Sequence, residues 1–298
     1  MKTPQQSYPE LAAALGVEEL YLKREDLHKY RSHKGRSIPL MIKRYLREGK
    51  NHFVISSSGN AALAAALTVE NHNRNNPEKT ISLDILVGTG IQIEKLKTLN
   101  EIANQGIGIN IKTLERPKQS AFQMAKEGSA IFLRQSTDDL ALEGYLSLAD
   151  ELSKIPKLEA VFIPTSSGTT AQALGEAFAR MSRSIQIHVL QTSRCHPIAE
   201  IFDKANEENK KTPSTSKAKA VVDKVAHRKN KVVYLVQASG GSGWILTNNE
   251  IEEAQNLVRE KTGLSISGNS ALSVAGLKKA LASGWNCKGT VVCLITGA

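Results

Sequence analysis

The sequence predicts an α/β protein with mainly parallel strands, because short runs rich in β-branched residues alternate with longer segments of helical periodicity. Parallel neighbours need a crossover connection, and a helix is the usual one. The expected strands are the apolar runs at residues 51–57, 81–88, 108–114, 130–135, 159–165, 185–192, 231–239 and 289–297.

Two of these runs end in small polar turns that lead directly into a helix. The segment "ISSSGNAALAAALTVEN" does so at 55–71, and "FIPTSSGTTAQALGEAFARM" does so at 162–181. Each turn places unpaired backbone N–H groups and the positive end of a helix dipole at the carboxyl edge of a sheet, where open α/β sheets bind ligands. The two turns therefore predict two anion sites, although a Ser, Thr or Asn N-cap also begins many helices without any ligand.

The composition limits the class of protein. A chain of 298 residues with 41% apolar and 23% charged residues is typical of a globular protein with one large or two ordinary domains. The sequence contains no run of eighteen apolar residues and no secretory signal pattern, so no membrane partner is expected and the default location is cytoplasmic. The three cysteines have no C-x-x-C spacing, so neither a disulfide framework nor a metal site is indicated.

The net charge of +10 is compatible with an anionic metabolite or with nucleic acid. The most basic segment, residues 204–231, is rich in Ser, Thr and Asn and poor in aromatic residues, so we interpret it as a solvated or mobile surface excursion. The basic residues are not interleaved with the aromatic residues on which single-stranded nucleic acid stacks, and no nucleic-acid partner is expected.

Several motifs occur in an order that resembles the fold type II pyridoxal phosphate (PLP) enzymes, and most closely the branch of threonine synthase and threonine dehydratase. The chain is similar to that family in "LYLKREDLHKYRSHKGRS", "SSSGNAALAAA", "IPTSSGTTAQALGEAF", "QTSRCHPIAEIF" and "VVCLITG". The resemblance implies two open, mainly parallel twisted sheets with helices on both faces, and a cofactor in the cleft between a larger and a smaller domain. It also implies a smaller mobile domain at 38–142, a larger cofactor-anchoring domain formed by 1–37 and 143–298, and a homodimer.

Carried over to this sequence, the resemblance makes Lys34 the residue that binds PLP as a Schiff base and then moves protons at the substrate carbons. Asn60 would hydrogen-bond the phenolic oxygen of the PLP ring. A substrate carboxylate would bind at the start of the following helix, and the cofactor phosphate at the second turn. The residues implied for the carboxylate are Ser57, Ser58, Gly59, Asn60 and Ala61, and those implied for the phosphate are Ser166, Ser167, Gly168, Thr169 and Thr170.

Thr296 falls where the family has a serine or threonine beside the pyridine nitrogen. A hydroxyl there, rather than a carboxylate, suits β- or γ-elimination and replacement better than transamination. The resemblance therefore implies a lyase that acts on a small L-amino acid, similar to threonine synthase (O-phosphohomoserine to threonine) or to a threonine or serine dehydratase. Alternatives are a cysteine-synthase-like β-replacement enzyme and a regulatory protein that binds PLP or an amino acid but is catalytically impaired.

Overall fold

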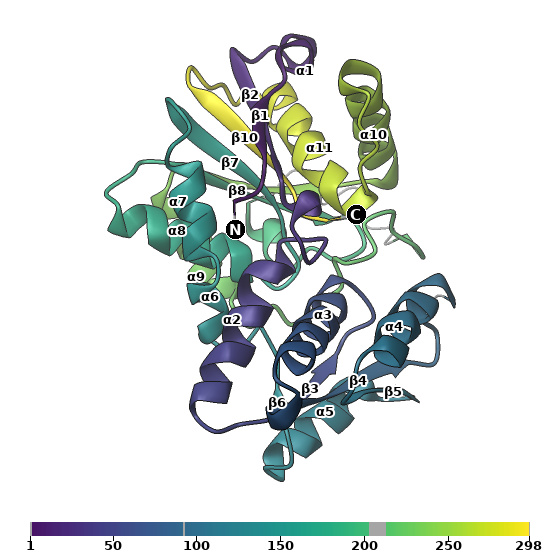
Figure 1. Cartoon of the computed structure of the whole chain (residues 1–298). Helices are drawn as coiled ribbons and strands as arrows, with labels where there is room; N and C mark the ends of the chain where they lie inside the picture. Colours follow the sequence, from purple (N-terminus) through teal and green to yellow (C-terminus); the bar gives the residue numbers. More distant parts are fainter. Residues whose placement is uncertain (1, 92, 203–212, 298) are drawn as a thin grey trace. The chain divides into compact units, whose positions relative to one another are not determined.

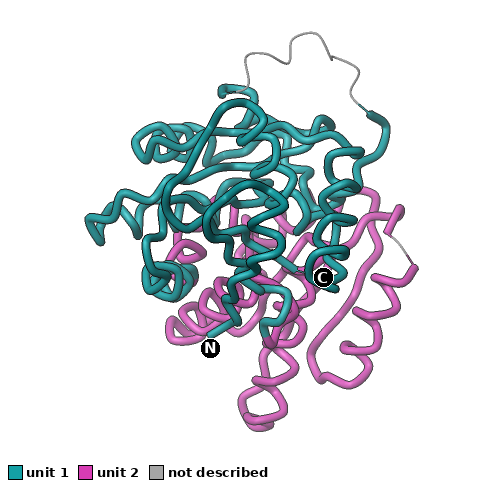
Figure 2. The backbone as a smooth tube through the Cα atoms, turned by 90° about the horizontal axis from the view of Figure 1, so that it is seen from above, with its two compact units in different colours: residues 1–28, 145–298 teal, residues 29–144 magenta. Residues whose placement is uncertain are grey.

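The structure is a computed structural model that describes residues 2–91, 93–202 and 213–297. The chain divides into two compact units, a larger one formed by Met1–His28 and Tyr145–Ala298 and a smaller one formed by Lys29–Gly144 (Figure 2). Each unit has its own mainly parallel sheet and its own helices, so the predicted α/β class with two open sheets is confirmed.

The sheet of the larger unit has six strands within the described ranges, in the order β1-β2-β10-β7-β8-β9. Figure 1 labels all of them except β9. Only β1 runs antiparallel to its neighbour, and the other pairs are parallel. Every residue of β10 is buried, as expected for a central strand that is covered on both faces. The strands are β1 (Gln5–Ser7), β2 (Glu19–Arg24), β7 (Leu158–Pro164), β8 (Gln186–Thr192), β9 (Gly243–Leu246) and β10 (Thr290–Ile295).

Helices pack against this sheet through apolar side chains. One core cluster joins Leu11, Ile251 and Leu272, from three different helices, to inward residues of β2, β7 and β10. The helices are α1 (Pro9–Leu15), α7 (Leu146–Leu152), α8 (Thr169–Arg180), α9 (Lys229–Ala238), α10 (Asn248–Thr262) and α11 (Gly268–Ala282), with 3-10 turns η1 (Glu25–Leu27) and η3 (Ala199–Ile201).

The smaller unit contains a fully parallel sheet in the order β5-β4-β3-β6. One core cluster contains Ile38 and Ala65 from two helices together with Phe53 of the sheet, and a second cluster contains Val54, Leu86 and Ala121. The elements are α2 (Lys34–Arg47), β3 (His52–Ser56), α3 (Asn60–Asn75), η2 (Pro77–Lys79), β4 (Ser82–Gly88), α4 (Ile93–Gln105), β5 (Ile109–Leu114), α5 (Pro117–Lys126), β6 (Ile131–Phe132) and α6 (Leu140–Glu143).

The boundaries of the units differ from the expected 38 and 142, because all of α2 packs within the smaller unit. It contacts α3 and α6, and the hydroxyl of Tyr45 donates a 2.8 Å hydrogen bond to Asp138. The smaller unit therefore begins at Lys29 and ends at Gly144. Lys34 belongs to this smaller unit, and not to the larger one as the expected boundaries implied.

The prediction of a strand at 231–239 is wrong, since these residues lie in α9 or at its end. The run "KVVYLVQAS" is β-branched, but its buried residues are Val232, Leu235 and Val236, which have the i, i+3, i+4 spacing of a helix face. The sequence analysis also missed β1, β2 and β9, which are short or interrupted by charged residues.

The interpretation of residues 204–231 as a solvated excursion is wrong for part of the segment. Ala218, Val221 and Ala226 are buried, and the backbone N–H of Ala220 donates to the side chain of Asn269 at 2.9 Å. Residues 204–212 lie outside the described residues. In the part of the chain that is described, no helix is long and apolar enough to cross a membrane.

Candidate active site

Lys34 is the first residue of α2 and follows a tight turn in the smaller unit. The hydroxyl of buried Ser32 accepts a hydrogen bond from the backbone N–H of Lys34 at 3.3 Å, and the carbonyl of Ser32 accepts one from Gly35 at 3.0 Å. Arg31 has a φ of 59°, which lies in the left-handed region that favours glycine. The half-buried side chain of Lys34 makes no ion pair or hydrogen bond with the described residues, which leaves its amine available to a ligand.

Gly144 packs against the backbone of the first turn of α2, a contact that the sequence did not predict. A Cβ on Gly144 would overlap the carbonyl oxygen of Arg36 and the Cα of Ser37, and it would lie 2.8 Å from the carbonyl carbon of Arg36. The amide of Gln135 also donates a hydrogen bond to the hydroxyl of Ser37. The backbone that carries Lys34 is thus supported by residues about a hundred positions away.

The Ser-Gly-Asn turn joins β3 to α3 in the same unit. The hydroxyl of Ser57 accepts a 3.3 Å hydrogen bond from the N–H of Gly59, and no side chain caps the first turn of α3. A Cβ on Gly59 would have no atom within 4 Å, so there is open space at this position. The amide of Asn60 makes no hydrogen bond with the described part of the chain, and it is available to a ligand.

The Ser166–Thr170 loop joins β7 to α8 in the larger unit. Gly168 has a φ of 91°, and a Cβ there would lie 2.7 Å from Cγ2 of Val232, so both its conformation and its packing require glycine. The hydroxyl of Ser166 accepts hydrogen bonds from Val222 N at 3.1 Å and from Asp223 N at 3.2 Å. With both lone pairs used, this hydroxyl can only donate further, as an anion site requires.

The rest of this loop is held by side-chain contacts. The hydroxyls of Ser167 and Thr169 lie 3.0 Å apart, and Thr169 and Thr170 are buried at the start of α8. Buried Gln191 donates to the carbonyl of Ser166 at 3.4 Å and accepts from Ile198 N at 2.8 Å. Gln191 was missed by the sequence analysis, although a glutamine within the apolar run "IQIHVLQT" was a usable signal.

Thr296 directly follows β10 and is buried. Because β10 pairs in parallel with β7, with Cys293 opposite Phe162, Thr296 and the loop after β7 lie at the same carboxyl edge of the sheet. The carbonyl of Gly297 accepts hydrogen bonds from Ser267 at 2.7 Å and from Ser270 at 2.8 Å. The structure therefore brings Thr296 and the Ser166–Thr170 loop together at one edge.

Comparison with known proteins supplies the family of the chain. The family model described as "Pyridoxal-phosphate dependent enzyme" matches residues 1–297. The chain belongs to this family. This pyridoxal-phosphate dependent enzyme is 27% identical over 312 residues to a threonine synthase from Methanocaldococcus jannaschii. The match covers 99% of this chain and 74% of that protein.

Two further proteins are similar to the chain. The human L-serine dehydratase/L-threonine deaminase is 29% identical over 162 residues, which cover 52% of this chain and 44% of that protein. A solved pyridoxal 5'-phosphate-dependent aspartate racemase superposes with a TM-score of 0.82 at 18% identity, over 100% of this chain and 90% of that one. At that identity the structural similarity shows the fold alone.

The residues present fit the family's cofactor, pyridoxal phosphate. An aldehyde cofactor with a phosphate group needs a primary amine and several hydrogen-bond donors. Lys34 offers an amine that has no described partner, and the Ser166–Thr170 loop offers hydroxyls and a helix N-terminus without any acidic side chain. No group of three or more His, Cys, Asp or Glu that could hold a metal ion occurs among the residues described.

Proposed function

We propose that this chain is a PLP-dependent lyase that carries out β- or γ-elimination or replacement on a small L-amino acid. Its reaction would resemble that of a threonine synthase, from O-phosphohomoserine to threonine, or that of a threonine or serine dehydratase. The main support is the combination of the amine of Lys34, which has no described partner, with similarity to a threonine synthase along 99% of the chain. The match to a serine dehydratase over half of the chain favours the second reaction in the same class.

When bound, the cofactor supplies an electron-withdrawing ring that stabilises negative charge at the substrate's Cα. In this proposal the amine of Lys34 takes the proton from Cα and returns a proton later in the reaction. The amide of Asn60 orients the ring by a hydrogen bond to its phenolic oxygen. Thr296 provides a hydroxyl rather than a carboxylate next to the ring nitrogen, which favours elimination and replacement over transamination.

The two polar turns bind the anionic groups in this proposal. Residues 57–61 receive the substrate carboxylate on the uncapped first turn of α3. Residues 166–170 hold the cofactor phosphate with the donating hydroxyl of Ser166 and the first turn of α8. Assembly as a homodimer and a cytoplasmic location are further predictions, and gel filtration with light scattering measures the first of them.

The test is a substrate screen on the PLP-loaded protein. O-phosphohomoserine, L-threonine, L-serine and O-acetylserine are supplied separately, and the visible spectrum, phosphate, oxo acid and amino-acid products are followed. We expect one of them to change the spectrum and to give an elimination or replacement product. If none does, the regulatory binding protein is the better explanation.

Two lysine variants make the screen specific. Lys34→Ala should lose the visible absorbance of lysine-linked PLP, and should lose the activity by several orders of magnitude, because no other amine replaces the proton carrier. Lys43→Ala, an exposed lysine in the same helix, should retain both. Activity retained in Lys34→Ala, or a parent protein that stays colourless with PLP, contradicts the proposal.

A further inference from the structure

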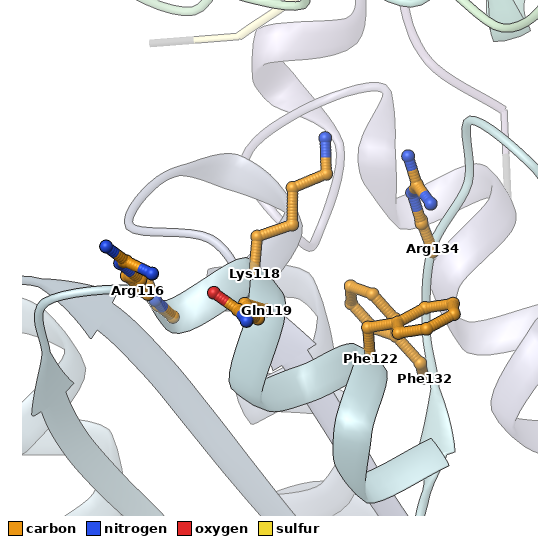
Figure 3. Close-up of a pocket in the computed structure, with 7 residues that line it drawn as sticks. Arg116, Lys118, Gln119, Phe122, Phe132 and Arg134 are labelled. Carbon is orange, nitrogen blue, oxygen red and sulfur yellow. The ribbon is translucent and has the colours of Figure 1, made fainter. Parts of the chain in front are cut away.

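A pocket outside the candidate active site lies in the smaller unit, at the start of α5 and the end of β6. Its cavity volume is about 570 Å³, within the range of small-molecule sites of roughly 300–1,000 Å³. Figure 3 shows the side chains of Phe122, from α5, and Phe132, from β6, pointing toward one another. The described residues that line it are Arg116, Pro117, Lys118, Gln119, Phe122, Phe132 and Arg134.

The side chains of Phe122 and Phe132 form an apolar surface that is only partly buried within the smaller unit. Phe122 remains 57% exposed, which is unusual for so large an apolar side chain. The ring of Phe132 is fixed in position, because it packs against the small core cluster that contains Val54, Leu86 and Ala121. A planar ring that covers Phe122 and Phe132 would bury apolar surface against a platform that is already ordered.

The polar part of the lining is entirely cationic or neutral. Arg116, Lys118 and Arg134 line the pocket, and none of its seven lining residues is acidic; Glu115, the neighbour of Arg116, does not line it. In the view of Figure 3 the charged ends of the Lys118 and Arg134 side chains lie above the two rings. No side chain caps the first turn of α5, so the N–H groups of Lys118 and Gln119 also favour an anion.

We propose that this pocket binds a nucleoside phosphate, with the base stacked on Phe122 and Phe132 and the phosphates held by Arg116, Lys118 and Arg134. A base supplies the planar ring, and the phosphates supply the negative charge that the lining complements. A purely apolar ligand would not use the charges of Arg116 and Lys118, and inorganic phosphate would leave the rings of Phe122 and Phe132 uncovered. The proposal is independent of the reaction at Lys34.

The experiment is isothermal titration of the full-length, PLP-loaded protein with ADP, so that the cofactor already fills its own phosphate site. ADP is compared with adenosine, which lacks the charge, and with pyrophosphate, which lacks the ring. We expect ADP to bind about tenfold more tightly than pyrophosphate, because only ADP stacks a base on the two rings. We also expect it to bind about tenfold more tightly than adenosine, because only ADP places phosphates beside the cations. Binding of pyrophosphate as tight as that of ADP overturns the proposal, as does the absence of ADP binding.

Variants locate the site. Phe122→Ala should weaken ADP binding about tenfold and leave pyrophosphate binding unchanged, and Arg116→Ala with Lys118→Ala should weaken both ligands about fivefold or more. These side chains are exposed, and circular dichroism checks that the variants fold.

The matched control removes two cations from another basic pocket of the same unit. Lys43→Ala with Arg47→Ala, in the pocket between α2 and α3, should leave ADP affinity unchanged. An equal loss of affinity in this control refutes the assignment to the α5 pocket. Tighter binding of a single-stranded RNA hexamer than of ADP, at equal nucleotide concentration, would overturn the assignment to a free nucleotide.

Discussion

Protonation of His188 should destabilise the larger unit as the pH falls. His188 lies on β8 with no exposed surface, stacked on Phe162 at a centroid distance of 4.3 Å. The indole N–H of Trp244 donates to Nδ1 of His188 at 3.1 Å. Because an indole nitrogen is only a donor, Nδ1 must be the acceptor, and the ring hydrogen is on Nε2, 3.2 Å from the side-chain oxygen of Gln186.

The sign and the size of the effect follow from this geometry. Burial lowers the pKa of His188 from 6.5 to about 3 in the folded protein. The unfolded chain therefore binds this proton at a higher pH than the folded chain does. The contribution of neutral His188 to the free energy of unfolding is therefore complete above about pH 6.5 and is lost as the pH falls toward about 3. At ~1.36 kcal/mol per pH unit, about 2 kcal/mol is lost by pH 5, and roughly 5 kcal/mol is the upper limit.

The assay is urea unfolding at a series of pH values between 8 and 4.5, followed by tryptophan fluorescence. Trp244 and Trp285 are the two tryptophans of the chain, and both contact His188, so the signal reports on this cluster. His188→Gln removes the titrating ring and keeps an amide that can donate or accept. The variant should be less stable at pH 8, because it loses the stacking on Phe162, but its stability should fall about 2 kcal/mol less between pH 8 and pH 5.

The same substitution at His72 is the control, because the ring of His72 lies near the surface of α3 in the smaller unit. His72→Gln should leave the pH dependence of tryptophan-detected unfolding as it is in the parent protein. Equal pH dependence in the parent and in His188→Gln would refute the argument that the buried neutral ring contributes this sensitivity.

Three further substitutions test local features. Arg31→Gly should raise the free energy of unfolding by about 1 kcal/mol in urea denaturation, because glycine adopts the left-handed conformation without strain; a loss of stability contradicts this. Gly144→Ala should cost about 1–3 kcal/mol in the same assay and weaken PLP binding, since its methyl group displaces the turn at Arg36; unchanged PLP affinity is the opposing result. Asp84→Asn should cost about 1–2 kcal/mol at pH 7 and flatten the acid limb of stability. Burial raises the pKa of Asp84, but the hydrogen bond with His52 and the ion pair with Lys112 outweigh it and lower the pKa below 3.8. The stabilising contribution of the carboxylate is therefore present above that pH and is lost below it. An unchanged acid limb in thermal denaturation argues against this.

Local sequence was sufficient for much of the fold, whereas the candidate site residues rest on the resemblance of several motifs to a known family and stay predictions. The alternation of apolar runs with helical periods predicted the α/β class, and seven of the eight expected strands contain or overlap a strand of the structure. The run at 231–239 was the exception, because β-branched content was given more weight than the helical spacing of Val232, Leu235 and Val236. Turns with several small polar residues before a helix were recognisable because the signals that start a helix lie in adjacent residues of the chain.

Packing between distant residues was decided only by the tertiary structure. Gly144 is required because the backbone of Arg36 lies against it, and no pattern near residue 144 encodes that approach. The hydroxyl of Ser166 is left to donate because Val222 and Asp223, more than fifty residues away, occupy its lone pairs. The sequence by itself determined where small polar turns follow a strand and lead into a helix, because that pattern lies in adjacent residues. Which donors and acceptors of those turns remain available to a ligand was decided by the tertiary structure, because the contacts that occupy them come from distant residues.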